Sequence, residues 1–212
     1  MMVRLPPSRD TLRRPGKPDT TAIDIAILPP ADVSARAIAL SSALPAAESQ
    51  GLLLGADYPP HITLTQQFVF SESLDSLFAQ IDRVLNDRGP LHLRVMGGGR
   101  GANSVWISIE RSPELLSLHE QLLHVAEPFE VTTGDSSAFF GDDARDRDVQ
   151  SVREFRRQSS LDRFTPHITL GHASEAPAID PMAFAATTIA VCHLGRFCTC
   201  PRVLRAWNSA GA

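Results

Sequence analysis

The pentapeptide Pro-His-Ile-Thr-Leu occurs twice in this chain, at residues 60–64 and at residues 166–170. At roughly 5% for each residue type, chance would repeat some tetrapeptide in about one such chain in ten, and the fifth letter lowers this chance about twentyfold. Each copy carries a histidine followed two positions later by a threonine, and one copy lies in each half of the chain. The repeat therefore predicts two related units that present the same pair of polar side chains.

Composition and charge are ordinary for a soluble globular protein. Of the 212 residues, 43% are hydrophobic, and the formal net charge of -4 provides no general attraction for nucleic acid. No apolar run approaches the roughly 18 residues that a membrane span requires. The three cysteines, in a sequence without a secretory leader, favour free thiols in a reducing compartment. We therefore expect a soluble cytoplasmic protein with no membrane partner. A monomer is the working expectation, on which the composition itself gives no information.

The N-terminal segment differs from the rest of the chain. Residues 1–19 contain four prolines and five basic residues but no periodic apolar pattern, which predicts a disordered tail. A basic arm for RNA is the alternative interpretation. For residues 20–212 we expect a single domain of two lobes, each carrying one copy of the repeated motif.

Apolar periodicity beyond the tail predicts helices and mainly antiparallel strands. Strands are expected at residues 21–28, 51–54, 61–70, 91–96, 104–109, 164–172, 187–198 and 202–207. Helices are expected at residues 32–44, 112–125 and 148–159, and another is expected from Ser71 or Ser73 to about residue 89. The glycines at 97–99 are expected to form a hairpin loop. The pattern indicates an α+β fold of two mainly antiparallel sheets flanked by helices.

The motif strands are expected to present their histidines and threonines on one face. Because side chains alternate along a strand, His61, Thr63 and Thr65 share a face, and so do His167 and Thr169. The aliphatic residues between them point the other way, into each lobe. If the two lobes pack about an approximate two-fold axis, both histidines and both motif threonines surround one groove.

This arrangement suits chemistry at a phosphodiester. Histidine has an unperturbed pKa near neutrality, so one imidazole can accept a proton while the other donates one. In-line attack at phosphorus needs the base and the acid on opposite sides of the phosphate, which a two-fold arrangement provides. Threonine hydroxyls can hydrogen-bond the non-bridging oxygens. This chemistry requires neither a metal nor a cofactor.

The paired motifs resemble those of the 2H phosphoesterase superfamily, which includes RNA 2',3'-cyclic phosphodiesterases and the bacterial 2'-5' RNA ligases. The resemblance covers most of residues 21–207, because the order of elements is similar as well. It implies a bilobal, pseudo-two-fold fold with a metal-independent site between the lobes. It also implies that His61 and His167 are the general acid–base pair, with His61 as the base for hydrolysis, and that Thr63 and Thr169 hold the phosphate.

The resemblance implies hydrolysis of a 2',3'-cyclic phosphate on an RNA end or a small nucleotide. Two alternatives stay open. The chain could be a module that binds nucleotides or RNA ends without turnover, or it could join RNA ends through 2'-5' bonds at the same site without ATP.

Two further features bear on substrate binding. Phe139 and Phe140 lie in a polar, acidic loop, where they are expected to act as a lid or to stack on a base. His172 follows the second motif, and strict alternation along a regular strand turns it away from His167, which favours a structural role or a place at the rim of the site.

The cysteines are grouped near the end of the chain. Cys192, Cys198 and Cys200 share parity if residues 187–198 form one strand, but no Cys-x-x-Cys spacing is present. We therefore expect buried free thiols and no metal site.

Overall fold

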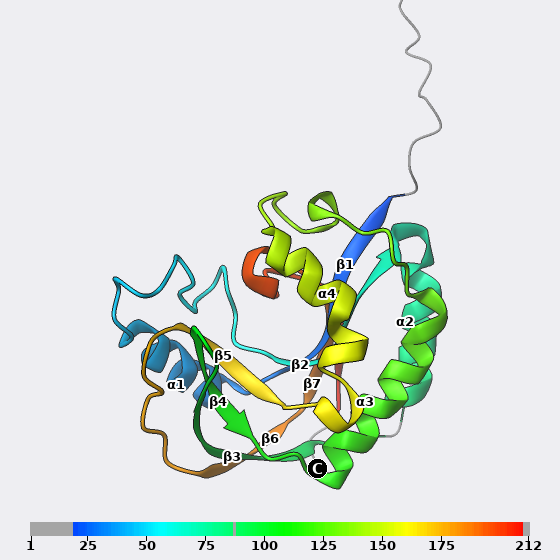
Figure 1. Cartoon of the computed structure of the whole chain (residues 1–212). Helices are drawn as coiled ribbons and strands as arrows, with labels where there is room; N and C mark the ends of the chain where they lie inside the picture. Colours follow the sequence, from blue (N-terminus) through cyan, green and yellow to red (C-terminus); the bar gives the residue numbers. More distant parts are fainter. Residues whose placement is uncertain (1–18, 87, 210–212) are drawn as a thin grey trace, which may run out of the picture.

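Two antiparallel sheets, each containing one motif strand, form the centre of the structure (Figure 1). The computed structural model describes residues 19–86 and 88–209, so the expected tail lies, apart from Asp19, outside the described residues. The first sheet has the order β2-β1-β7-β8 and the second has the order β5-β4-β3-β6. The strands are β1 (Thr20–Leu28), β2 (Ile62–Phe70), β3 (Leu91–Arg100), β4 (Ser104–Ile109), β5 (His167–His172), β6 (Met182–Ala186), β7 (Thr188–His193) and β8 (Arg202–Asn208).

The helices lie close to the ranges predicted from the sequence. They are α1 (Ala31–Ser42), α2 (Leu74–Leu85), α3 (Pro113–Ala126) and α4 (Asp146–Gln158). The side chain of Ser112 caps α3, because it accepts a hydrogen bond from the backbone N–H of Leu115 at 3.2 Å. α2 packs against α3, α4 lies over β2, and α1 contacts β5 (Figure 1). The expected α+β class is therefore confirmed.

Short 3-10 turns complete the connections between these elements. They lie at Ser71–Ser73, Glu127–Phe129, Ser136–Ala138, Leu161–Arg163 and Arg196–Cys198.

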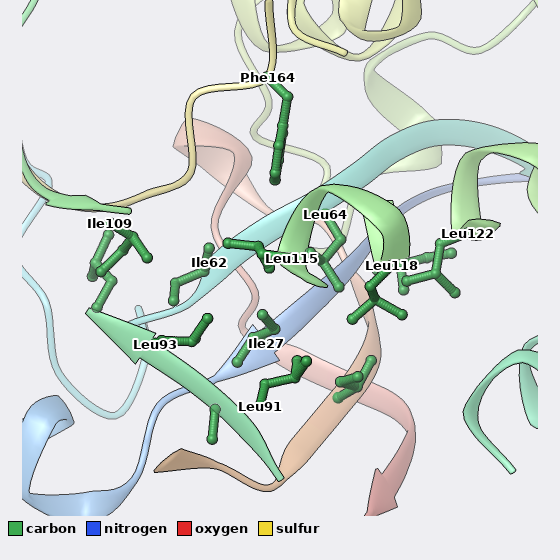
Figure 2. Packing of buried hydrophobic residues seen from close by; sticks show 14 of the residues in the cluster. Ile27, Ile62, Leu64, Leu91, Leu93, Ile109, Leu115, Leu118, Leu122 and Phe164 are labelled. Carbon is green, nitrogen blue, oxygen red and sulfur yellow. The ribbon is translucent and has the colours of Figure 1, made fainter. Parts of the chain in front are cut away.

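One hydrophobic core joins the two sheets and α3 (Figure 2). Ile62 and Leu64, the aliphatic residues of the first motif, are fully buried in this core, as the alternation predicted. Burying a side chain of this size contributes about 1.5–3 kcal/mol to folding. The core side chains labelled in Figure 2 are Ile27, Ile62, Leu64, Leu91, Leu93, Ile109, Leu115, Leu118, Leu122 and Phe164.

The strand expected at residues 51–54 is absent, and this prediction was wrong. The segment is irregular, yet Leu52 and Leu54 are buried. The backbone N–H of Leu54 donates to the hydroxyl of Ser41 on α1 at 3.0 Å instead of to a neighbouring strand. The apolar residues at 51–54 belong to a buried loop, and sequence periodicity cannot distinguish such a loop from a short strand.

The glycines expected in a hairpin loop are part of β3, where Gly98 pairs with Ile107 and Gly99 with Trp106. A Cβ atom on Gly98 would lie 2.1 Å from the backbone oxygen of Pro177. Glycine is needed at this position because it lets a neighbouring segment approach closely, and not because the chain turns there. β6 was not predicted from the sequence, and β7 ends at His193, before the predicted end of this strand at residue 198.

Candidate active site

The four motif residues predicted from the sequence line one cavity of about 410 Å³. His61 directly precedes β2 and His167 begins β5, while Thr63 and Thr169 lie two residues further along. The strands β2 and β5 contact each other although they belong to different sheets. The structure thus brings together, at one point, two segments that are separated by about half of the chain.

A β-bulge in β2 changes which side chains face this cavity. Ile25 of β1 pairs with Thr65, but the next residue, Ala26, pairs with Thr63, so Leu64 is the extra residue. Beyond the bulge the alternation is reversed. Thr65, expected on the face of the catalytic candidates, is buried away from the cavity, whereas Gln66 lines it.

A second bulge occurs at the corresponding point of β5. Val105 of β4 pairs with Gly171 and Trp106 pairs with Thr169, so Leu170 is skipped. His172 therefore lines the cavity, and the expectation that it turns away from His167 was wrong because the strand is not regular.

The two ring nitrogens of His172 differ in their hydrogen bonding. Its Nδ1–H donates to the backbone oxygen of Asn103 at 2.9 Å. The residue is only 8% exposed, and its Nε2 atom has no hydrogen-bond partner among the described residues. His172 and Gln66 each follow their motif histidine by five residues (167 to 172 and 61 to 66), so they occupy equivalent places in the two units.

The two motif histidines are oriented in the same way. The Nδ1–H of His61 donates to the backbone oxygen of Pro59 at 3.0 Å, and that of His167 donates to the oxygen of Thr165 at 2.7 Å. A neutral imidazole that donates through Nδ1 keeps its lone pair on Nε2. Nε2 is therefore the atom through which each ring would exchange a proton. The backbone of Cys198 is a second hydrogen-bond partner of His61.

Burial shifts both histidines toward the neutral form. Loss of water lowers the pKa of His61, and hydrogen bonding to the backbone of Pro59 partly opposes this change. Loss of water also lowers the pKa of His167, and the charge of His61 lowers it further. This electrostatic coupling is what two imidazoles sharing one cavity should show.

Asp24 of β1 was missed by the sequence analysis and lies beside the first motif. It is 0% exposed, and its Oδ2 atom accepts hydrogen bonds from the Thr63 hydroxyl at 2.7 Å and the Gln66 amide at 2.9 Å. The same oxygen lies 3.9 Å from Nε2 of His61. Burial raises the pKa of Asp24 to about 7, and the bonds from Gln66 and Thr63 partly offset this rise. The available signal was a lone carboxylate in a strand whose other residues are threonine, alanine, isoleucine and leucine.

Phe139 and Phe140 lie outside the cavity lining. Phe139 is 2% exposed and packs edge-on against Phe68 with ring centroids 5.9 Å apart. Phe140 is 41% exposed, but its backbone N–H donates to Leu194 at 2.8 Å and its ring stands beside His193. The structure therefore does not place this pair as a lid, because one ring is a core residue and the other is anchored elsewhere.

Other aromatic residues line the cavity instead. Phe155 of α4, Phe164 and Phe197 contribute to its wall. Phe197 has a left-handed backbone (φ 65°), and its ring lies 3.9 Å from the guanidinium carbon of Arg145 and 5.8 Å from the ring of His172. Nothing in the local sequence distinguished Phe197, because its position depends on the fold of the loop between β7 and β8.

The three cysteines are free thiols, as expected. Cys192 and Cys200 are buried, whereas Cys198 is partly exposed and lines the cavity. Because β7 ends at His193, Cys198 and Cys200 lie in the following loop and not on one strand with Cys192.

Among the described residues, none of the helices has the length and apolar character needed to cross a bilayer.

Paired His-x-Thr strands facing one cavity between two antiparallel sheets define a 2H phosphoesterase fold. Solved structures agree with this class. Escherichia coli LigT complexed with phosphate is 21% identical, with a TM-score of 0.58 over 91% of this chain and 99% of that chain. The TT0787 protein of Thermus thermophilus is 20% identical, with a TM-score of 0.56 over 90% of this chain and 99% of that chain. At these identities the likeness establishes the fold.

The family is established by the sequence itself. Residues 29–193 match the 2'-5' RNA ligase superfamily, and the chain belongs to this family of phosphoesterase- and ligase-like enzymes. No curated protein matches the chain.

Proposed function

We propose that this protein hydrolyses a 2',3'-cyclic phosphate on an RNA end or a small nucleotide by two-histidine acid–base catalysis. The observation that carries the proposal is the matched geometry of His61 and His167. Both rings line one cavity, and each is anchored through Nδ1, which leaves Nε2 as the atom for proton exchange. Imidazoles are the side chains of this cavity best suited to exchange protons near neutral pH. His61 and His167 are the two that belong to the repeated motif, whereas His172 follows it.

In the proposed reaction His61 takes a proton from a water molecule as its oxygen attacks phosphorus. The bond from phosphorus to one ribose oxygen breaks, and His167, which enters the step protonated at Nε2 as well as Nδ1, gives its Nε2 proton to that leaving oxygen. His61 is assigned as the base by analogy with the family.

The motif threonines are proposed to contact the phosphoryl oxygens. In the structure Thr63 donates its hydroxyl hydrogen to Asp24, and the short separation of 2.7 Å would also suit donation from a protonated Asp24. When Asp24 is protonated, Thr63 is free to donate to a phosphoryl oxygen. Thr169 lines the cavity at the equivalent position of β5.

The ligands of structural neighbours support a substrate that contains a phosphate and a nucleoside. E. coli LigT has been solved in complex with phosphate, with 3'-AMP, with NADP+ and with ATP. In the present chain, the aromatic wall formed by Phe155, Phe164 and Phe197 could stack on a base while the histidines face the phosphate.

The test is hydrolysis of the four nucleoside 2',3'-cyclic phosphates and of a short RNA with a cyclic-phosphate end, all in EDTA. We expect turnover in the wild type and a loss of about 10²-fold or more in His61→Ala and in His167→Ala. His124→Ala, which changes an exposed histidine on α3, is the matched control and should keep the wild-type rate. Turnover that EDTA abolishes, or a His167→Ala variant of normal rate, would contradict the mechanism.

The same preparations separate the alternatives. Tight binding of these compounds without hydrolysis of any of them would indicate a binding module. Joining of RNA ends that carry a 2',3'-cyclic phosphate and a 5'-hydroxyl, without ATP, would indicate a ligase that uses the same site.

A further inference from the structure

Three side chains of different chemical types come together at the buried end of the candidate active site. They are Asp24 of β1, His61 at the start of β2 and Cys200 in the loop before β8, and one potential metal-binding atom from each lies within 4.8 Å of the other two. Cys200 is 1% exposed, and its thiol hydrogen-bonds with that of Cys192. The group therefore lies at the buried end of the cavity, where His61 is the member that lines it.

The surroundings of the first two residues are those of metal-binding side chains. A histidine that binds a metal through Nε2 characteristically donates its Nδ1–H to a carbonyl or carboxylate, as His61 does to Pro59. A carboxylate that binds a metal is characteristically held by hydrogen bonds, as Asp24 is by Thr63 and Gln66. Both side chains are thus preorganised by neighbours outside the group of three.

One carboxylate oxygen of this group lacks a hydrogen-bond partner. Oδ1 of Asp24 is buried and has no hydrogen-bond partner among the described residues, although its sister oxygen accepts two hydrogen bonds. Buried carboxylate oxygens are nearly always satisfied, because leaving one unpaired costs about 1–3 kcal/mol or more. A cation beside Asp24 would satisfy it.

We propose that Asp24, His61 and Cys200 bind a divalent transition-metal ion of the Zn²⁺ type, with a fourth coordination position open toward the cavity. One carboxylate oxygen, one imidazole nitrogen and one sulfur form a donor set that zinc accepts. Zinc binds such atoms at about 2.0–2.3 Å, so tetrahedral donors lie about 3.3–3.8 Å apart. The 3.9 Å between His61 Nε2 and Asp24 Oδ2 needs only a small side-chain movement to reach this range.

Metal binding at this place requires no oxidation or reduction. The Cys200 thiol releases its proton to solvent, the sulfur forms a bond to the metal, and Asp24 binds as the carboxylate. A divalent cation favours the thiolate and the carboxylate over their protonated forms, so metal binding at this place releases protons.

The consequence for catalysis rests on the proposed function. A metal bound to Nε2 of His61 occupies the lone pair that would accept the proton from water. The ion is therefore an inhibitor of hydrolysis and not a cofactor, and the site would make the enzyme sensitive to free zinc.

Cobalt(II) added to the full chain without substrate tests the metal site directly. We expect a thiolate-to-cobalt charge-transfer band together with the visible bands of tetrahedral cobalt. Cys200→Ser should lose the charge-transfer band and bind cobalt more weakly by more than about 100-fold, the upper end of what losing an outer partner costs. Cys198→Ser is the matched control: Cys198 is the more exposed thiol and lines the cavity but lies outside the group of three, so its variant should keep the band.

Either of two results would overturn the proposal: no thiolate band in the wild type at saturating cobalt, or an unchanged band in Cys200→Ser. Circular dichroism of each variant shows whether it is folded. Asp24→Asn provides a second ligand variant, which should also bind cobalt more weakly while it keeps all three cysteines.

A separate assay with Zn²⁺ tests inhibition, with each variant compared with its own metal-free rate. The wild type and Cys198→Ser should be inhibited, and Cys200→Ser should need at least about tenfold more zinc. If the metal-free wild type hydrolyses nothing, the proposed function fails while the cobalt band still decides the metal site.

Discussion

At the scale of single residues, Asp24 has the largest consequence for stability. Its pKa is about 7 in the folded protein and 3.8 as a free side chain, so the folded state binds the proton more tightly. Between these two pH values the folded state carries more protons than the unfolded state, and the free energy of unfolding falls as pH rises. The contribution is fully present below pH 3.8 and is lost as pH passes about 7.

Asp24→Asn should remove this dependence. We expect the free energy of unfolding of the variant, relative to the wild type, to increase by a few kcal/mol between pH 4 and pH 7, at about 1.4 kcal/mol per unit of pKa shift. Urea denaturation at a series of pH values measures this difference, with the exposed Asp32→Asn as the control. A difference that is the same at pH 4 and pH 8 would refute the expectation.

The buried histidines act in the opposite direction. Because burial lowers the pKa of His61 and of His167 below 6.5, the folded state resists their protonation, and stability is lost as pH falls through this region. This contribution is common to the wild type and Asp24→Asn, so it largely cancels in the comparison.

The same two shifts predict the pH dependence of catalysis. The profile of kcat/KM reports the free enzyme, in which one imidazole has to be neutral and the other protonated. Since both pKa values are lowered, we expect a bell-shaped profile with its maximum on the acidic side of pH 6.5. Initial rates at low substrate concentration across pH 4–9 measure it, and a maximum above pH 7.5 would contradict the expectation.

At the scale of elements, Ser41 joins three parts of the chain around the site. From α1 its hydroxyl donates to the backbone oxygen of Leu170 on β5 at 2.6 Å and accepts from the N–H of Leu54 at 3.0 Å. Ser41→Ala would leave both backbone groups unpaired in the interior. We expect a loss of about 1–3 kcal/mol in the free energy of unfolding, measured by urea denaturation. The exposed Ser42→Ala should stay within about 0.5 kcal/mol of the wild type.

Gly98 controls how closely β3 approaches the segment that leads to β6. An alanine Cβ would lie 2.1 Å from the backbone oxygen of Pro177, and backbone cannot move aside as a flexible side chain can. Gly98→Ala should therefore destabilise the protein by about 1–3 kcal/mol, as overpacking usually does. Gly55→Ala, where a Cβ meets nothing within 4 Å, is the control, and equal melting temperatures for the two variants would exclude this explanation.

At the scale of the whole molecule, the shared core predicts that residues 20–209 unfold as one unit. The core contains side chains from both sheets, so neither sheet can bury its apolar face alone (Figure 2). Each sheet also contains one tryptophan, Trp207 on β8 of the first and Trp106 on β4 of the second. Trp106→Phe and Trp207→Phe then yield two proteins whose fluorescence reports one sheet each.

We expect coincident urea unfolding curves for fluorescence and circular dichroism in each single-tryptophan protein. A difference in the m-value or midpoint between the two probes of the same protein would show that the lobes unfold separately.

Local pattern was enough to predict much of the structure. The period of apolar residues placed α3 and most of the strands, and alternation assigned Ile62 and Leu64 to the core. The repeated motif also identified the four residues that meet in the candidate site. These features depend on backbone geometry within a few residues, which is why the sequence alone determined them.

Tertiary structure decided what depends on pairing between distant strands. The bulges at Leu64 and Leu170 turn Gln66 and His172 into the cavity, because each bulge is defined by the register with a neighbouring strand. The sheets are not the two halves of the chain, since β7 and β8 return to pair beside β1. That return brings the loop carrying Cys200 over Asp24. A local pattern contains no information on these contacts, because they form only when segments far apart in sequence are packed together.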